Sequence, residues 1–226
     1  MATTLQDRPL SGLLGAGQII TNPVELITYE RDGTLRSGHP DAVALPQTTD
    51  EVVRVVRWAA AHGRPLIARG AGTGLSGGAV AEGGGVIVSF ARMNRILEFD
   101  PIGATLITEP GVTNLTLDET VRKHGLYFPP DPSSGRSATI GGNIAENSGG
   151  PHCFKYGVTT NYVNGLQVVV GDGQVLHLGG PAADYPEYDF ISLFTGGEGT
   201  LGLITRAHLR LMRNPPAVQT MMAAFD

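Results

Sequence analysis

A glycine-rich segment is the part of this sequence best suited to holding an anion. Residues 69–78 read Arg-Gly-Ala-Gly-Thr-Gly-Leu-Ser-Gly-Gly, and a backbone so rich in glycine can adopt positive φ or approach a ligand closely. Successive N–H groups in such a loop can surround an anionic group, and the hydroxyls of Thr73 and Ser76 add donors. The segment therefore predicts a pyrophosphate-binding loop. Arg69 has two possible roles: it steadies this loop or its phosphates, or it forms a structural or surface ion pair. A side chain at Gly74 is expected both to strain a positive φ and to block the approach of the phosphate.

The same loop contains the pattern Gly-x-Gly-x-x-Gly, at 72–77, of a Rossmann dinucleotide site. A Rossmann loop opens a long amphipathic helix, whereas residues 78–85 include three consecutive glycines. Glu98 lies at about the right distance downstream for a ribose-binding carboxylate, but the missing helix makes NAD(P) binding the weakest hypothesis. No Gly-Lys-Ser or Gly-Lys-Thr occurs, so a P-loop is excluded.

A second glycine-rich segment lies further along the chain. Residues 139–150 read Thr-Ile-Gly-Gly-Asn-Ile-Ala-Glu-Asn-Ser-Gly-Gly, and the turn-forming run Pro-Asp-Pro-Ser-Ser precedes them at 130–134. The pattern is helical from Ile140 onward. Its small residues leave room either for a flat or long ligand or for tight helix packing, and the first loop and the proline-rich turn together favour ligand contact.

The elements that must position these segments occur in the same order twice. A helix over 48–62 begins with a Thr48–Glu51 capping box and ends at His62-Gly63, and a strand over 65–68 leads into the first loop. A strand over 105–109, a helix over 114–123 that ends at His124-Gly125, and a strand over 126–128 precede the second segment. Unless it is a coincidence, this order predicts two segments that converge on one elongated ligand.

The remaining pattern predicts a sheet-rich second half. Further strands are expected over 85–90, 166–170, 174–178 and 201–211, with a hairpin turn at 171–173, a helical turn at 189–194 and a linker at 214–216. With 226 residues, 41% of them hydrophobic, the chain fits one large α/β or α+β domain.

Charge and cysteine usage exclude several classes of protein. The 16 Lys and Arg against 21 Asp and Glu leave a net charge of −5, the wrong sign for a nucleic-acid-binding surface, so backbone groups must hold any phosphate. Cys153 is the only cysteine, so neither a disulfide framework nor a cysteine-based metal site is expected. Residues 1–17 resemble neither a signal peptide nor a transmembrane segment. A cytoplasmic protein without a transmembrane segment is expected.

No side chain offers a clear catalytic group. Cys153 follows His152 but has no second cysteine, and a lone thiol is more often inert than reactive. The six histidines lack paired metal-ligand spacing, so no metal site is expected. Asp172 belongs to the hairpin turn, whereas Glu198, between glycines, has either a structural or a ligand-binding role.

Four motifs in order resemble one known family. The segments at 65–78, 130–134, 139–150 and 198–205 resemble the FAD-binding (PCMH-type) domain of the vanillyl-alcohol oxidase superfamily, and within it the glycolate oxidase FAD subunit and the D-lactate and D-2-hydroxyglutarate dehydrogenases. The resemblance covers about residues 42–211. It implies an α+β fold of two subdomains, with mixed sheets flanked by helices and FAD stretched between them.

The resemblance also implies domain limits and cofactor contacts. The FAD-binding domain would span 1–213, with subdomains at about 40–100 and 101–213, and 214–226 would link it to a C-terminal substrate domain that this sequence lacks. Family members that attach flavin through a histidine of the first loop carry it near Thr73, so FAD is expected to be non-covalent. The residues implied to contact FAD are Arg69, Gly70, Ala71, Gly72, Thr73, Gly74, Ser76, Gly77, Pro130, Asp131, Ser134, Thr139, Gly141, Gly142, Asn143, Ser148, Glu198, Gly199 and Ile204.

The activity implied is a flavin-dependent dehydrogenase or oxidase of 2-hydroxy acids such as glycolate or D-lactate, in which a hydride passes to flavin N5. Its metal-binding and proton-accepting residues would lie beyond Asp226. The alternatives are a non-catalytic FAD-carrying subunit that relays electrons to a partner and a flavin reductase of cell-wall sugar synthesis, which the Pro-Asp-Pro-Ser-Ser turn disfavours. Flavin or iron–sulfur subunits are the partners implied, at the inner face of the membrane.

Overall fold

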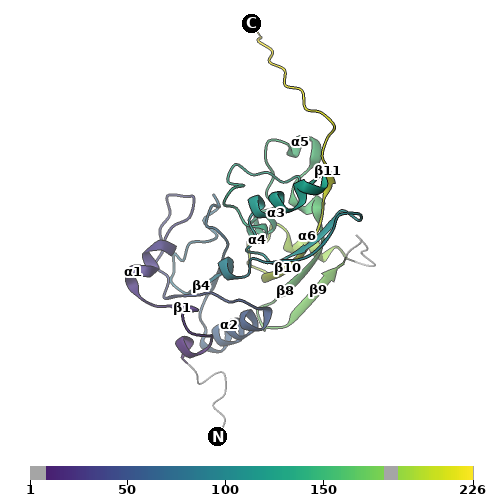
Figure 1. Ribbon diagram of the computed structural model, residues 1–226. Coiled ribbons are helices and arrows are strands. Elements are labelled where there is room, and N and C mark those ends of the chain that lie inside the picture. The colour runs from purple at the N-terminus through teal and green to yellow at the C-terminus, as the bar shows by residue number, and fades with distance from the viewer. Residues whose placement is uncertain (1–8, 181–187, 226) are drawn as a thin grey trace.

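The computed structural model describes residues 9–180 and 188–225, so residues 1–8 of the N-terminal segment lie outside the described residues (Figure 1). Within this part of the chain, the strands form a four-stranded sheet, a five-stranded sheet and a two-stranded ribbon. The expected mixed architecture of sheets flanked by helices is confirmed. None of the described helices is long and apolar enough to cross a bilayer.

The four-stranded sheet has the order β1 (Ile19–Ile20), β2 (Ala42–Ala44), β4 (Val86–Ser89), β3 (Leu66–Arg69). Strands β2, β4 and β3 run parallel, and β1 is antiparallel to β2. Val43 and Ile87 are buried on one face and Val86 and Val88 on the other. Both faces are thus covered, as parallel strands require, and the end of β3 delivers the chain into the first glycine loop.

Helix α2 (Thr49–His62) covers one face of this sheet and buries Val52, Val55 and Val56. The Thr48 hydroxyl accepts the Glu51 N–H at 3.2 Å, and Gly63 ends the helix at φ +58°. The Glu51 carboxylate accepts the N–H of Gln47 rather than that of Thr48, so only half of the expected capping box forms.

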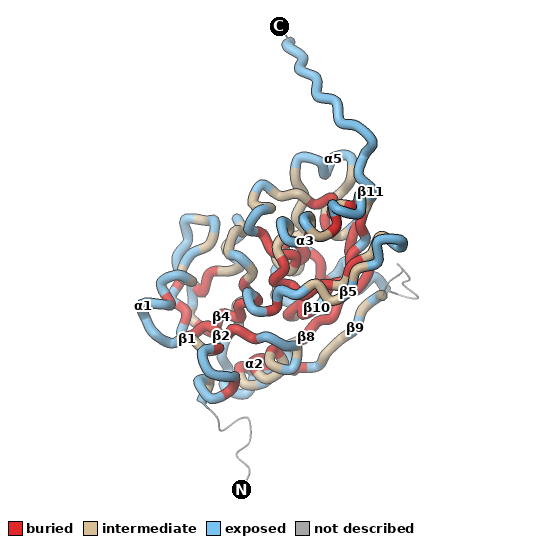
Figure 2. Tube along the Cα trace, in the orientation of Figure 1, coloured by how far each residue is buried: buried red, intermediate tan, exposed pale blue. Residues whose placement is uncertain are grey.

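The five-stranded sheet is antiparallel throughout. Its order is β5 (Ile96–Asp100), β6 (Thr105–Thr108), β10 (Leu203–Arg210), β8 (Val163–Val169), β9 (Val175–Gly179). Helices α3 (Asn114–Val121), α4 (Ile140–Glu146) and α6 (Phe190–Phe194) contribute to the core on one face of this sheet (Figure 1). The buried residues gather along its central strands β8 and β10 and along β2 and β4 (Figure 2).

Short elements complete the chain. Strand β7 (Leu126–Tyr127) pairs with β11 (Met212–Arg213), after which the chain leaves the body as an extended segment (Figure 1). The other short helices are α1 (Pro23–Leu26), α5 (Cys153–Tyr156) and 3₁₀ turns at Leu10–Gly12, Ile27–Tyr29, Phe90–Arg92, Arg122–His124 and Thr159–Tyr162.

The sequence patterns located most elements to within a few residues. They missed β1, β2, β5 and β11, because these strands are very short or, in β5, carry Glu98 and Asp100 on an exposed face. The repeated order also proves less regular than expected, since β2 and β3 share one sheet whereas β6 and β7 lie in different sheets. The division into subdomains at 40–100 and 101–213, with a linker at 214–226, stays a prediction.

Candidate functional site

A cleft of about 370 Å³ lies where the two glycine-rich segments meet. Its walls come from three places: the loop after β3, the turn before α4 together with α4 itself, and the loop before β10. The repeated order of elements therefore does bring both segments to one cavity. A volume of this size is typical of small-molecule sites.

The first wall is the loop over 70–78. Among the described residues, no hydrogen-bond partner is recorded for the backbone N–H groups of residues 71–78. Gly72 and Gly77 have φ of +68° and +83°, whereas Gly74 is not at positive φ. The expectation of strain at Gly74 is therefore wrong, because the residues of this loop in the left-handed region are Gly72 and Gly77. The successive free N–H groups form a donor set suited to an anion.

Arg69 supports this loop from behind. Its guanidinium donates to the carbonyl of Ala79 at 3.1 Å and to that of Arg31 at 2.7 Å, and it lies over the Tyr29 ring. A Cβ built at Gly72 would lie 2.3 Å from Nη2 of Arg69. Burial lowers the pKa of Arg69 from its ordinary value. Of the two roles expected for Arg69, these hydrogen bonds favour the one that steadies the loop over a structural ion pair.

The second wall is built around the start of α4. The Thr139 hydroxyl accepts the Gly142 N–H at 3.3 Å, and a Cβ at Gly70 would lie 2.3 Å from that hydroxyl. Gly141 approaches Pro110 so closely that its Cβ would lie 2.6 Å from the proline Cβ. The small residues of α4 thus permit tight packing, and the same glycines line the cleft. Their contact with a ligand stays a prediction.

Asn143 lines the cleft but its side chain is buried and engaged. Its amide donates to Oδ1 of Asn114, and the Asn114 amide donates to the carbonyl of Pro130 at 3.1 Å. This chain of hydrogen bonds fixes the Pro130–Ser134 turn against α4. Asn143 therefore positions the wall of the cleft.

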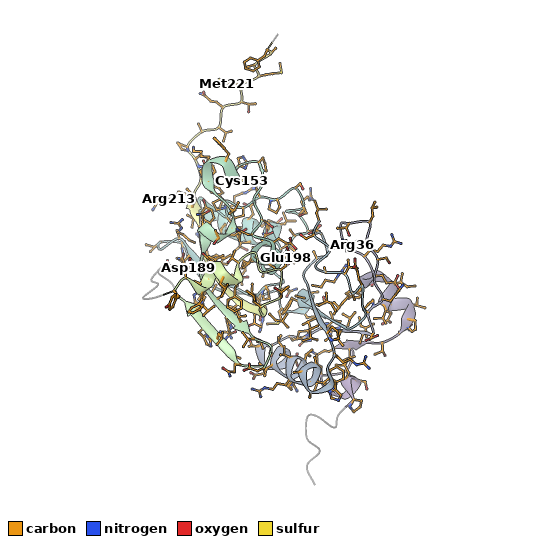
Figure 3. The ribbon with its side chains drawn as sticks, turned by 180° about the vertical axis from the view of Figure 1, so that it is seen from behind. Arg36, Cys153, Asp189, Glu198, Arg213 and Met221 are labelled. Carbon is orange, nitrogen blue, oxygen red and sulfur yellow. The ribbon has the colours of Figure 1, made fainter. Side chains whose placement is uncertain are left out.

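The third wall carries Glu198. This residue has φ of +50°, which is uncommon for a residue with a side chain, and its N–H donates to the Ala145 carbonyl at 2.9 Å. A Cβ at Gly199 would lie 2.8 Å from that of Ala68, so glycine is needed for this wall to meet β3. Glu198 lies near the middle of the molecule, whereas Arg36 lies at one side (Figure 3).

One hydrogen bond joins the first two walls across the cleft. The Ser76 hydroxyl donates to Oε2 of Glu146 at 2.6 Å. A Cβ at Gly78 would lie 3.4 Å from the Glu198 carboxylate and 3.9 Å from that of Glu146. A Cβ at Gly74 would also lie 3.4 Å from the Glu146 carboxylate, so the two carboxylates flank the loop from Gly74 to Gly78.

Most of the residues expected at the cofactor line this cleft, and three do not. Those that line it are Arg69, Gly70, Ala71, Gly72, Thr73, Gly74, Ser76, Ser134, Thr139, Gly141, Gly142, Asn143, Ser148, Glu198, Gly199 and Ile204. Gly77 instead approaches the Arg36 side chain, Pro130 accepts the Asn114 hydrogen bond, and Asp131 contacts Nδ1 of His152.

Several lining residues lie outside the sequence motifs. Asp32, Phe90, Pro110 and Ala138 reach the cleft from separate parts of the chain, and no local pattern marks them. Glu146 lies inside the second motif, and its charge among small residues could have marked it in the sequence as a residue of the cleft. The charged side chains on the cleft walls are Asp32, Arg69, Glu146 and Glu198.

The cleft combines two kinds of surface. The first loop contributes free backbone N–H groups, and Phe90, Pro110, Leu203 and Ile204 contribute apolar surface. Since the donors belong to the backbone, the negative net charge of the chain does not oppose this arrangement.

The chain resembles known flavoproteins over nearly all of its length. Residues 40–179 match the family described as FAD binding domain. The chain is 41% identical to the glycolate oxidase subunit GlcD of Escherichia coli strain K12, over 92% of this chain and 42% of that protein. It is also 41% identical to the D-2-hydroxyglutarate dehydrogenase of Stutzerimonas stutzeri, over 91% of this chain and 45% of that protein.

A solved structure of alkyldihydroxyacetonephosphate synthase has the same fold, with a TM-score of 0.79 and 26% identity over 90% of this chain and 39% of that one. The chain thus spans less than half the length of these relatives.

Proposed function

Since the chain belongs to the family of FAD-binding domains, we propose that it forms the flavin-holding part of a dehydrogenase or oxidase of 2-hydroxy acids of the glycolate or D-lactate type. The observation that carries this proposal is the cleft, in which two glycine-rich walls meet around free backbone N–H groups. The resemblance to GlcD and to D-2-hydroxyglutarate dehydrogenase supports the substrate class.

The proposed roles follow from the three walls. These walls would hold FAD, which would supply the redox chemistry as the acceptor of the substrate Cα hydride. The N–H groups of 71–78 hold the pyrophosphate, with Arg69 keeping the loop in shape. The Pro130–Ser134 turn and the glycines at the start of α4 border the ribityl chain and the isoalloxazine ring. Glu198, Gly199 and the backbone at Ile204 border the adenosine end.

A second candidate is a subunit that carries FAD and passes electrons to a partner without binding substrate itself. The lining of the cleft supports this second candidate. The charged side chains among its described lining residues are three carboxylates and Arg69, whose guanidinium already donates to two carbonyls. A 2-hydroxy acid carries a carboxylate, which needs a cationic partner. Flavin or iron–sulfur subunits at the cytoplasmic face of the inner membrane are the proposed partners in either case.

The visible spectrum of the purified protein tests the proposal directly. Bound oxidised flavin is expected to absorb at about 450 nm, and adding FAD to cofactor-free protein should restore that band. Protein that shows no such band and takes up no added FAD would contradict the proposed function.

The bound FAD is expected to be non-covalent, because Thr73 lies near the position at which the family resemblance implies a linking histidine in members that attach flavin covalently, and a threonine cannot form that bond. Precipitating the yellow protein with acid should release all of its flavin into the supernatant. A free-FAD sample carried through the same steps controls for trapping, and flavin that stays with the washed pellet would show a covalent bond.

A further inference from the structure

Asp32 holds a buried carboxylate oxygen without a hydrogen-bond partner beside the cleft. Its Oδ1 accepts the N–H of Thr34 at 2.8 Å and the Thr34 hydroxyl at 2.6 Å. Its Oδ2 is buried, and no partner for it is found among the described residues. Because an unpaired buried acceptor is costly, this oxygen requires an explanation.

Neither of the two cations near Asp32, Arg36 and Arg69, satisfies that oxygen. The Arg36 guanidinium donates to the Glu82 carboxylate at 2.7 Å. The Arg69 guanidinium donates to the carbonyls of Arg31 and Ala79, and no ion pair between Arg69 and Asp32 is recorded in the described chain. The charge of Asp32 does favour the charged form of Arg69, so the two charges offset each other at longer range. This long-range attraction stabilises the partly buried Asp32 carboxylate and leaves its Oδ2 free to accept a hydrogen bond.

The turn that carries Asp32 packs directly on the glycine loop. The N–H of Gly33 donates to the Gly74 carbonyl at 3.1 Å, and a Cβ at Gly33 would lie 3.0 Å from the Thr73 carbonyl. Asp32 itself is one of the residues that line the cleft. Its carboxylate therefore stands beside the part of the loop whose N–H groups suit an anion.

We infer that Oδ2 of Asp32 accepts a hydrogen bond from a sugar hydroxyl of the cofactor, next to the pyrophosphate. A carboxylate is an acceptor only, so it repels a phosphate and selects a donor. In FAD the groups on both sides of the pyrophosphate are polyols: the ribityl chain on the flavin side and the ribose on the adenosine side. Asp32 is thus a positioning residue for one of these polyols, an inference that rests on FAD binding by the chain.

The variant Asp32→Asn tests this inference. Asparagine keeps the Oδ1 acceptor for Thr34 but replaces Oδ2 by an NH₂ donor. The Kd for FAD is expected to rise about 10- to 100-fold, the usual effect of losing a hydrogen bond to a charged group. The Tm of the cofactor-free protein should stay unchanged or rise, because an unpaired buried charge is removed. A purely structural role predicts the opposite change in Tm.

Two smaller probes locate the hydroxyl. Weaker binding of ADP by Asp32→Asn would assign Asp32 to the ribose, whereas weaker binding of FMN with normal binding of ADP would assign it to the ribityl chain. Either result supports the inference. Equal binding of FAD by Asp32→Asn and the unchanged protein would overturn it, as would a loss of FAD binding that accompanies a lowered Tm of the cofactor-free protein.

Two control variants keep the result specific. Asp172→Asn changes an exposed carboxylate in the hairpin turn, far from Asp32 in the sequence, that accepts hydrogen bonds from Gln174 and from no other described residue. This variant should bind FAD normally. Thr34→Ala removes two hydrogen bonds of the turn, the one that its hydroxyl donates to Oδ1 of Asp32 and the one that it accepts from the Arg36 N–H, while leaving Oδ2 in place, so its Kd for FAD should change little. If the unchanged protein itself fails to bind FAD, the proposed function fails, a result distinct from an Asp32→Asn protein that binds as well as its parent.

Discussion

Replacing Gly74 with valine is expected to lower the affinity for FAD about 10- to 100-fold while the protein still folds. Gly74 lines the cleft within the loop whose N–H groups are free, so a branched side chain there occupies space that the proposed site gives to the pyrophosphate. Filling such a space costs about 1–3 kcal/mol or more, and each 1.4 kcal/mol is a factor of about ten in affinity.

The fold should tolerate this change because Gly74 is not at positive φ and a Cβ there would meet only the Glu146 carboxylate, at 3.4 Å. Gly72 differs in both respects, with φ of +68° and a Cβ position 2.3 Å from the Arg69 guanidinium. Gly72→Val should therefore destabilise the cofactor-free protein as well. Comparing the two variants separates blocked ligand access from a damaged loop.

The measurements are the Kd for FAD by flavin fluorescence and the Tm of the cofactor-free protein. Gly83→Val is the matched control, since Gly83 lies outside the cleft in open space and is not at positive φ. Gly74→Val protein that retains a normal flavin content would show that this loop does not hold the cofactor.

The 226-residue chain, loaded with FAD, is expected not to oxidise 2-hydroxy acids at an enzymatic rate. The reaction needs a base within hydrogen-bond reach of the substrate hydroxyl, and such a base contributes a factor of about 10² to 10⁴. It also needs a cation for the substrate carboxylate. Neither histidine nor lysine is among the described residues that line the cleft, and Arg69 is held by two carbonyls.

Anaerobic mixing with D-lactate, glycolate and D-2-hydroxyglutarate tests this expectation, with bleaching of the flavin band as the readout. Dithionite serves as the positive control, because it should bleach the same band at once. Rapid bleaching by any of the three acids would place the substrate site within this chain. The candidate catalytic groups would then be Asp131, in the Pro130–Ser134 turn, and His152, which contacts it.

The family and the cofactor were predictable from the sequence because their signals are local. Each glycine-rich motif specifies much of its own backbone, since a positive φ, as at Gly72 and Gly77, is tolerated by few other residues. The capping residues Thr48 and Thr139 likewise mark helix starts that depend only on their immediate neighbours. Such features can be identified without knowing where the rest of the chain lies.

Contacts between distant segments were decided by the tertiary structure alone. Asp32 reaches the cleft, Ser76 bonds to Glu146, and Asn143 turns to Asn114 only because the sheets and helices pack in one arrangement. The direction of the Arg69 side chain depends equally on the carbonyl of Arg31, from a distant turn, and on that of Ala79, at the end of the glycine loop. Sequence spacing places a residue on a loop or helix, whereas the direction and partners of its side chain are set by packing between elements far apart in the chain. The sequence by itself therefore determined where the glycine-rich backbone of the cleft lies along the chain, and the tertiary structure decided which side chains stand beside it.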